Sequence, residues 1–200
     1  MDRQNNHFIQ LREGIPAGMR VAAATLYLEA LADKLVPVFG RGDRAVQALA
    51  RVFNRQMCLV AQDGERLVGV LGIQTAAAGF MDIQWGALRS CYGFSGSLWR
   101  MALLSALHHE PMEIEAYVDG VAVAPAWRGR GIGSRLIAAL ESWAADRDLE
   151  MLCLEVVDTN SRAETLYRHL GFEIVRHQTV WPLGSLFGFH SSKVMVKPLG

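Results

Sequence analysis

Residues 121–134 limit the fold and chemistry of this chain more than any other stretch; they read VAVAPAWRGRGIGS. A short apolar run ends at Pro125, and three glycines follow at alternate positions where a helical pattern begins. Such a turn has little side-chain bulk, and its N–H groups can form a concave nest for an anion. The helix expected from Gly133 adds unsatisfied N–H groups and the positive end of its dipole. With the cations of Arg128 and Arg130, this glycine loop (residues 128–134) predicts a pyrophosphate site.

The spacing of these three glycines does not match two other phosphate-binding loops. Gly129-x-Gly131-x-Gly133 is neither the G-x-G-x-x-G of dinucleotide-binding folds nor a Walker sequence, because no Gly-Lys-Ser/Thr follows. Glu155 lies at about the distance where a Rossmann fold has its ribose-binding acid, but the chain has a single β-α-β pattern, and it comes late. A structural turn without a ligand is the plain alternative, and it leaves the three glycines and two arginines at a helix start unexplained.

Composition excludes several classes of function. The 200 residues suit a single domain, 1–200, or one domain with an insertion, and 20 basic residues balance 20 acidic ones. Without a basic excess we expect no nucleic-acid or membrane partner. Cys58, Cys91 and Cys153 are far apart and have no metal-ligand or disulfide spacing, so we expect no metal. The first residues are polar and no apolar run approaches the roughly 18 residues of a membrane span, so we expect a cytoplasmic protein.

The pattern of apolar residues predicts an α+β domain. We expect a strand at 7–12, a helix over 16–38, and a second helix over 43–54 that Asp43 caps. Two strands, 56–61 and 67–74, form a hairpin whose turn contains Asp-Gly. Residues 75–111, with a helix over 98–108, then read as an insertion that covers one mouth of the domain.

The second half of the chain has a clearer order. A strand over 113–124 leads into the glycine loop, a helix runs to about residue 147, and a nearly continuous apolar strand follows at 151–157. Strand, helix and strand form a β-α-β crossover, which requires parallel pairing. A helix over 161–170 closes at Gly171, and strands at 172–180 and 192–197 finish the chain as an antiparallel pair. The loop 181–189 between them is rich in aromatic residues.

At this point two motifs carry a family resemblance. The pattern V-x-P-x-x-R-G-x-G-I-G at residues 123–133, followed by N-x-x-A-x-x-x-Y-x-x-x-G-F at 160–172, resembles the GNAT superfamily of N-acetyltransferases. The resemblance is specific over residues 115–175. It implies a mixed, splayed sheet of six to seven strands flanked by helices, with the insertion between the third and fourth strands. It also implies that acetyl-coenzyme A binds in the gap between the strands 113–124 and 151–157.

The same resemblance implies the cofactor contacts. The backbone at Val121 and Val123 pairs with the pantetheine arm, and the amide of Asn160 contacts that arm. Asn160 could instead cap a helix, but Ser161-x-x-Glu164 is itself a capping box that leaves the asparagine free. The pyrophosphate is bound by Arg128, Gly129, Arg130, Gly131, Ile132, Gly133 and Ser134.

Candidate proton-transfer groups follow from the chemistry of amine acetylation. An amine with a pKa near ~10.4 is less than about a thousandth neutral at pH 7, so it needs a base. Glu155 precedes Tyr167 by the spacing of the ribosomal-protein alanine N-acetyltransferases, which this segment resembles, and there the glutamate acts through water. Glu115 and Asp119 are competing carboxylates. Tyr167 is either a half-buried core tyrosine or, as the resemblance implies, the general acid for the departing thiolate.

These motifs predict an acyltransferase in which an amine attacks acetyl-coenzyme A directly; the alternative is a non-catalytic acyl-coenzyme A binding or sensing module. The acceptor is open: a small amine, an amino acid or a protein N-terminus. The expected acceptor surfaces, 75–111, the first helices and 181–189, are apolar and aromatic, which argues against a strongly charged acceptor. Exposed aromatic residues in 181–189 would suit a homodimer contact. His108, His109 and Cys153 are interpreted as structural.

Overall fold

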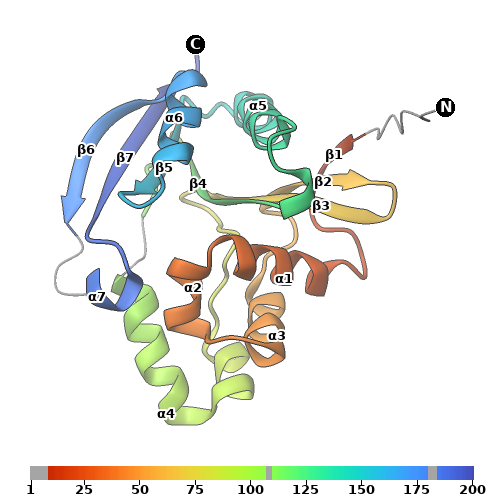
Figure 1. Ribbon diagram of the computed structural model, residues 1–200, viewed down its shortest axis with the longest axis vertical. Helices are drawn as coiled ribbons and strands as arrows, with labels where there is room; N and C mark the ends of the chain where they lie inside the picture. Colours follow the sequence, from red (N-terminus) through yellow and green to blue (C-terminus); the bar gives the residue numbers. More distant parts are fainter. Residues whose placement is uncertain (1–8, 107–109, 180–183) are drawn as a thin grey trace.

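The computed structural model describes residues 9–106, 110–179 and 184–200. Within these ranges, seven strands form one open sheet in the order β1-β2-β3-β4-β5-β7-β6 (Figure 1). The mixed α+β fold predicted from the sequence is therefore confirmed. The strands are β1 (Ile9–Glu13), β2 (Cys58–Asp63), β3 (Arg66–Gln74), β4 (Glu115–Val123), β5 (Met151–Val157), β6 (Glu173–Thr179) and β7 (Ser191–Pro198).

Pairing within the sheet is antiparallel except between β4 and β5, which run parallel. The parallel pair confirms the predicted β-α-β crossover. β7 lies between β5 and β6 and is antiparallel to both, which confirms the predicted pair of final strands. The hairpin predicted at residues 62–65 joins β2 to β3.

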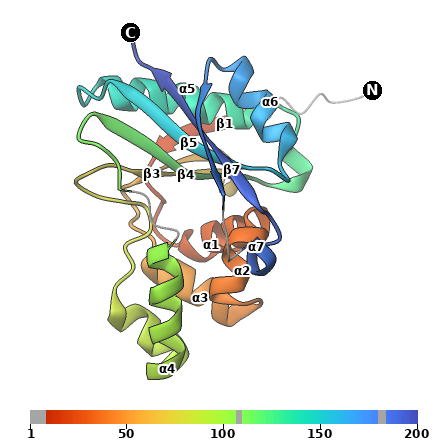
Figure 2. The ribbon, with the colours of Figure 1, turned by 90° about the vertical axis from the view of Figure 1, so that its left-hand side faces the viewer.

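Helices cover both faces of the sheet (Figures 1 and 2). Alternate residues of one strand pack into two different cores: Val60 of β2 joins the cluster around α1 to α4, whereas Leu59 joins the cluster under α5. This alternation is the period-two pattern of a strand buried on both sides. The helices are α1 (Arg20–Ala30), α2 (Ala32–Phe39), α3 (Asp43–Val52), α4 (Trp85–Ala106), the 3-10 turn η1 (Pro125–Trp127), α5 (Ile132–Ala145), α6 (Ser161–His169) and α7 (Gly184–Phe187).

The single helix predicted over 16–38 was wrong, because the chain forms α1 and α2 with a break at Leu31 (φ −115°, ψ 34°). Apolar residues continue on both sides of the break, with Tyr27 and Leu35 both buried, so periodicity gave no sign of it. The cap predicted at Asp43 was also wrong. Gly42 is the N-cap of α3, and Asp43 lies in its first turn, where its charge still favours the helix dipole.

The inserted segment lies between the third and fourth strands, as predicted, but its helix is longer than the predicted 98–108. α4 begins at Trp85, and Gly93 interrupts it with a non-helical backbone (φ 70°, ψ −172°). Figure 2 shows α4 extending away from the sheet, below α1 and α3. His108 and His109 lie outside the described residues. In the described part of the chain, no helix has the length and apolar character to cross a membrane.

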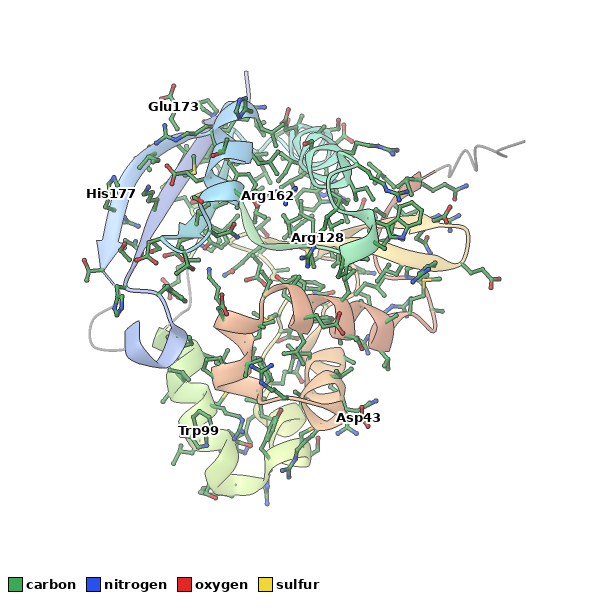
Figure 3. The ribbon with its side chains drawn as sticks, viewed as in Figure 1. Asp43, Trp99, Arg128, Arg162, Glu173 and His177 are labelled. Atoms are coloured by element: carbon green, nitrogen blue, oxygen red, sulfur yellow. The ribbon has the colours of Figure 1, made fainter. Side chains whose placement is uncertain are left out.

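The aromatic residues expected to be exposed in 181–189 are largely buried where the structure describes them. Phe187 and Phe189 are 2% and 3% exposed and pack into the core beside α2; Trp181 lies outside the described residues. Large exposed apolar side chains lie instead on α4, where Phe94 is 65% and Trp99 is 46% exposed (Figure 3). Among the described residues of this loop, Phe187 and Phe189 therefore do not form the expected exposed aromatic surface.

Candidate active site

The sheet opens between β4 and β5. Their paired residues run from Glu115↔Met151 to Val118↔Leu154, although β4 continues to Val123 and β5 to Val157. The pairing of β4 with β3 shifts at the same level, because Ile73 pairs with Val118 whereas Gly72 pairs with Gly120. Asp119 is therefore the extra residue of a β-bulge. Asp119 and Glu155 are the first residues beyond the end of the pairing, one on each side of the opening.

The glycine loop lies at the C-terminal end of β4. Gly129 and Gly131 have φ of 75° and 74°, a conformation that side-chain-bearing residues rarely adopt, and Gly131 is the N-cap of α5. A Cβ atom added at either glycine would meet nothing within 4 Å, so open space lies above the loop. Ile132, in contrast, is 2% exposed and fixes the start of α5 in the core. The loop thus presents backbone N–H groups and a helix N-terminus to a space where an anion fits.

Contacts within the loop hold its two arginines in place. Arg128 Nε donates to the carbonyl of Val123 at 3.0 Å, and the Arg130 guanidinium lies 4.9 Å from the ring centroid of Trp127. Figure 3 labels Arg128 beside η1 and Arg162 in the first turn of α6. Arg128 uses one lone pair of the Val123 carbonyl and leaves the second for another donor. Val121 lies two residues before Val123 and is partly buried on the same strand.

The structure corrects the interpretation of Asn160. This residue is the N-cap of α6, and its Oδ1 accepts the N–H of Ala163 at 3.1 Å. Within the described residues, the Glu164 carboxylate does not close the expected capping box but contacts Arg168 and Lys193. The cap uses only the amide oxygen, so the NH2 group can still donate to a ligand.

A cavity of about 1060 Å³ lies at the opening of the sheet, and we call it the splay cavity. Its walls come from α1 and α2, from the inserted segment, and from β4 and β5. The inserted segment contributes its first loop and the end of α4, so it covers this side of the opening. Tyr27, Lys34, Tyr117, Asp119 and Glu155 line the cavity.

Most residues that line this cavity are apolar, which agrees with the expected apolar surface, but charged groups line it as well. Among the described residues that line it, one carries an amine, Lys34, and four carry carboxylates: Asp82, Glu110, Asp119 and Glu155. Of the aromatic residues that suggested an apolar surface, Phe189 lines the cavity, whereas Phe94 and Trp99 on α4 are exposed. Among the described residues, no cluster of three or more His, Cys, Asp or Glu side chains could hold a metal ion.

The three candidate carboxylates differ in environment. Glu155 is 25% exposed, its Oε1 accepts a short hydrogen bond from the Ser192 hydroxyl, and its Oε2 lies 3.9 Å from Lys34 Nζ. Glu115 is 3% exposed, accepts the N–H of Met112 at 3.3 Å, and is not among the residues that line the cavity. Of these three candidate carboxylates, only Glu155 and Asp119 therefore line the cavity where an acceptor could bind.

Tyr167 lies on α6, with its ring edge-on to Phe172 at a centroid distance of 5.7 Å. Burial raises the pKa of its hydroxyl to about 12. Tyr167 is thus a neutral phenol on the β5 side of the opening. Cys153 is 3% exposed, and burial raises the pKa of its thiol, in keeping with a structural role.

Three cavity residues were not found from the sequence: Tyr27, Lys34 and Tyr117. Each carries a side chain that is common on a helix or strand, and none belongs to a motif. Only Tyr117 had an indirect signal, because it lies two residues before Asp119 in the strand that leads to the glycine loop. Tyr27 in α1 and Lys34 in α2 lie on either side of the break at Leu31, and no sequence pattern predicted that break.

Comparison with curated proteins gives partial matches to acetyltransferases. The chain is 37% identical over 65 residues to the thialysine N-epsilon-acetyltransferase of Bos taurus, which covers 32% of this chain and 38% of the relative. It is 25% identical over 81 residues to an aminoglycoside N(6')-acetyltransferase type 1 of Salmonella typhimurium, which covers 40% of this chain and 54% of the relative. The matches thus span about a third to a half of each relative.

Solved structures resemble the whole chain. The ribosomal-protein-S18-alanine N-acetyltransferase from Escherichia coli superposes with a TM-score of 0.62 at 16% identity, covering 96% of this chain and 94% of the other. An N-acetyltransferase from Staphylococcus aureus Mu50 gives 0.65 at 17% identity, covering 94% and 99%. At such identities the likeness concerns the fold. The model of the acetyltransferase (GNAT) family matches residues 25–172, most of the chain and all of the opening described above, so the chain belongs to the acetyltransferase (GNAT) family.

Proposed function

We propose that the protein transfers an acetyl group from acetyl-coenzyme A to a primary amine in a ternary complex. One observation carries the proposal: the opening between β4 and β5 has a glycine loop bordered by open space at one end and a cavity lined by carboxylates at the other. A pyrophosphate on the loop and an amine in the cavity would bring the two substrates together at the opening. Family membership supports acyl transfer in general.

The residues fit coenzyme A. The open space above Gly129 and Gly131 would take the pyrophosphate, with the N–H groups of residues 129–134 as donors and the arginines as cations. β4 beyond Val118 is unpaired on its β5 side, so its backbone at Val121 and Val123 can bind an amide-bearing arm. Acetyl-coenzyme A supplies an activated acyl group and a thiolate that can leave. The protein supplies the positioning.

Glu155 is our proposed base, acting through water. The Ser192 hydroxyl orients its carboxylate, and the residue lies at the opening on the strand opposite the bulge. Lys34 approaches the other carboxylate oxygen at 3.9 Å, which leaves room for a water molecule or an amine to bind there. Asp119 is the second candidate, because it lines the same cavity from β4.

Tyr167 is proposed to donate a hydrogen bond to the departing sulfur. A phenol with a pKa of about 12 is a weaker acid than a thiol near ~8.5 by roughly three orders of magnitude. Complete proton transfer to the thiolate is therefore uphill, whereas a hydrogen bond from the neutral phenol has no such cost. The thiolate then takes its proton from solvent after release.

The acceptor is proposed to be a small amine with net positive charge. The four carboxylates around the splay cavity attract cations, and its volume has room for a small amine beside the acyl group. The relatives named for thialysine and for aminoglycosides are consistent with this class. Entry of an extended peptide is less favoured, because the inserted segment closes part of the cavity wall.

Release of free thiol from acetyl-coenzyme A tests this proposal against a non-catalytic binding module. We expect turnover with cationic amines such as diamines and basic amino acids, and none with anionic amines of similar size. Isothermal titration should show acetyl-coenzyme A binding in the same preparation. Binding without turnover on any amine would favour the binding module, and an absence of binding would rule out both functions.

A further inference from the structure

Tyr27 is one of two tyrosines that are buried beside the opening, the other being Tyr117. It is 1% exposed, and its ring lies edge-on to Phe53 and Phe80 at centroid distances of 5.5 and 5.2 Å. Phe53 and Phe80 are themselves stacked at 4.2 Å. This aromatic packing uses the faces and edges of the ring, and a phenylalanine would provide it equally well. The packing therefore does not explain the hydroxyl group.

The Tyr27 hydroxyl is buried and has no hydrogen-bond partner within the described chain. A buried donor without a partner destabilises a protein, so such groups require an explanation. Its position suggests one: a Cβ atom at Gly120 would lie 2.6 Å from Tyr27 Oη. The hydroxyl thus lies against the backbone of the bulge, beside Asp119, where the sheet opens, and Tyr27 lines the splay cavity.

The hydroxyl keeps its proton at this position. Burial raises the pKa of Tyr27 well above its usual value, and the nearby charge of Asp119 raises it further. A buried neutral phenol can donate one hydrogen bond, and it gains most from an acceptor on which negative charge develops. Among the groups of the two proposed substrates, the carbonyl oxygen of the acyl thioester fits this description, since a protonated amine offers only donors.

We propose that Tyr27 Oη donates a hydrogen bond to the carbonyl oxygen of the acyl group at the β4 bulge, and that Tyr27 is a catalytic residue. The inference rests on the proposed function. Gly120 makes room for the hydroxyl, the Phe53 and Phe80 rings fix its direction, and the thioester carbonyl is the missing partner. A fixed donor of this kind stabilises the charge that develops on the oxygen during attack by the amine.

The test compares acetyl-coenzyme A with coenzyme A, which lacks the carbonyl. Isothermal titration of Tyr27→Phe should show about 2- to 10-fold weaker binding of acetyl-coenzyme A, the range expected for one hydrogen bond, and unchanged binding of coenzyme A. Turnover with the best amine should fall about 10²-fold at unchanged amine KM. The unliganded variant should melt at the same temperature as the wild type or higher, because it loses a hydroxyl that had no protein partner.

Tyr92→Phe is the matched control. The Tyr92 hydroxyl donates to the Phe39 carbonyl at 2.7 Å, away from the splay cavity, so its loss should lower the melting temperature and leave both affinities unchanged. Equal effects of Tyr27→Phe on both ligands, no effect on either, or a variant that melts earlier or fails to fold would each overturn the assignment. The wild-type titration separates failure of the proposed function from failure of the Tyr27 assignment. If the wild type binds acetyl-coenzyme A, an unchanged ratio of the two ligand affinities in Tyr27→Phe contradicts only the role of Tyr27.

Discussion

The two ends of the opening are built in different ways. The glycine loop comes from one continuous stretch, in which strand, turn and helix follow one another within about twenty residues. The splay cavity is assembled from α1, α2, the inserted segment, β4 and β5, which are far apart in the chain. The loop presents backbone groups, whereas the cavity presents side chains. A site of the first kind is visible in a sequence motif, and a site of the second kind depends on how the elements pack.

Substitution of the proposed base in the splay cavity should have the largest effect, and that effect should be on turnover. Glu155→Gln removes the proposed base but keeps the size of the side chain, so turnover should fall about 10²- to 10⁴-fold while acetyl-coenzyme A affinity stays within twofold. Steady-state kinetics and titration together measure this. Asp119→Asn is the comparison, because a larger loss in that variant would assign the base to β4 instead of β5.

A substitution in the glycine loop should lower the affinity for acetyl-coenzyme A. Gly131→Val places a branched side chain at φ 74° and in the open space above the loop. The strain is roughly 1–2 kcal/mol, and with the lost space we expect acetyl-coenzyme A affinity to fall at least about tenfold. Gly64→Val, in the β2–β3 turn at φ 56° with equally open surroundings, carries similar strain and should leave the affinity unchanged. Equal losses in both variants would mean that the loop has no special role.

A smaller effect should reveal the charge preference of the cavity. Lys34→Met removes the cation 3.9 Å from Glu155 and leaves the cavity carboxylates without it. Exposed ion pairs contribute up to about 1 kcal/mol, so KM for a cationic amine should fall by no more than about fivefold. An uncharged amine of similar size should show no such change. A rise in KM for the cationic amine would contradict the proposed acceptor class.

The smallest effect concerns alkaline stability. The folded pKa of Tyr167 is about 12, above the ~10 of an unfolded tyrosine. Its contribution is therefore complete below pH ~10 and is lost as the pH rises towards 12, because the unfolded chain releases the proton first. Between pH 9 and 10.5 the wild type should lose more unfolding free energy than Tyr167→Phe, by less than about 1 kcal/mol. Urea unfolding at both pH values measures the difference, and equal losses would argue against the raised pKa.

Predictions from sequence succeeded where the signal is local. The order of the strands along the chain, the parallel β4–β5 pair and the glycine loop all follow from short-range patterns, because periodicity and turn residues act within one element. The N-cap of α6 is a local feature that the sequence nevertheless predicted wrongly. Asn160 was expected to be free, yet it caps α6, and Glu164 binds Lys193 of a distant strand instead of closing a capping box. The observed cap therefore differs from the one that the local pattern predicted.

The sequence by itself determined the family, the sheet with its single crossover, and the loop at the C-terminal end of β4. Only the tertiary structure decided that Tyr27 and Lys34 line the splay cavity, that Glu115 lies outside it, and that Phe187 and Phe189 are buried. The physical reason is the distance along the sequence over which each signal acts. Backbone geometry at glycines and hydrophobic periodicity are properties of neighbouring residues, whereas a cavity is what remains after distant elements have packed their apolar faces together. No single segment of the chain specifies which residues line the splay cavity.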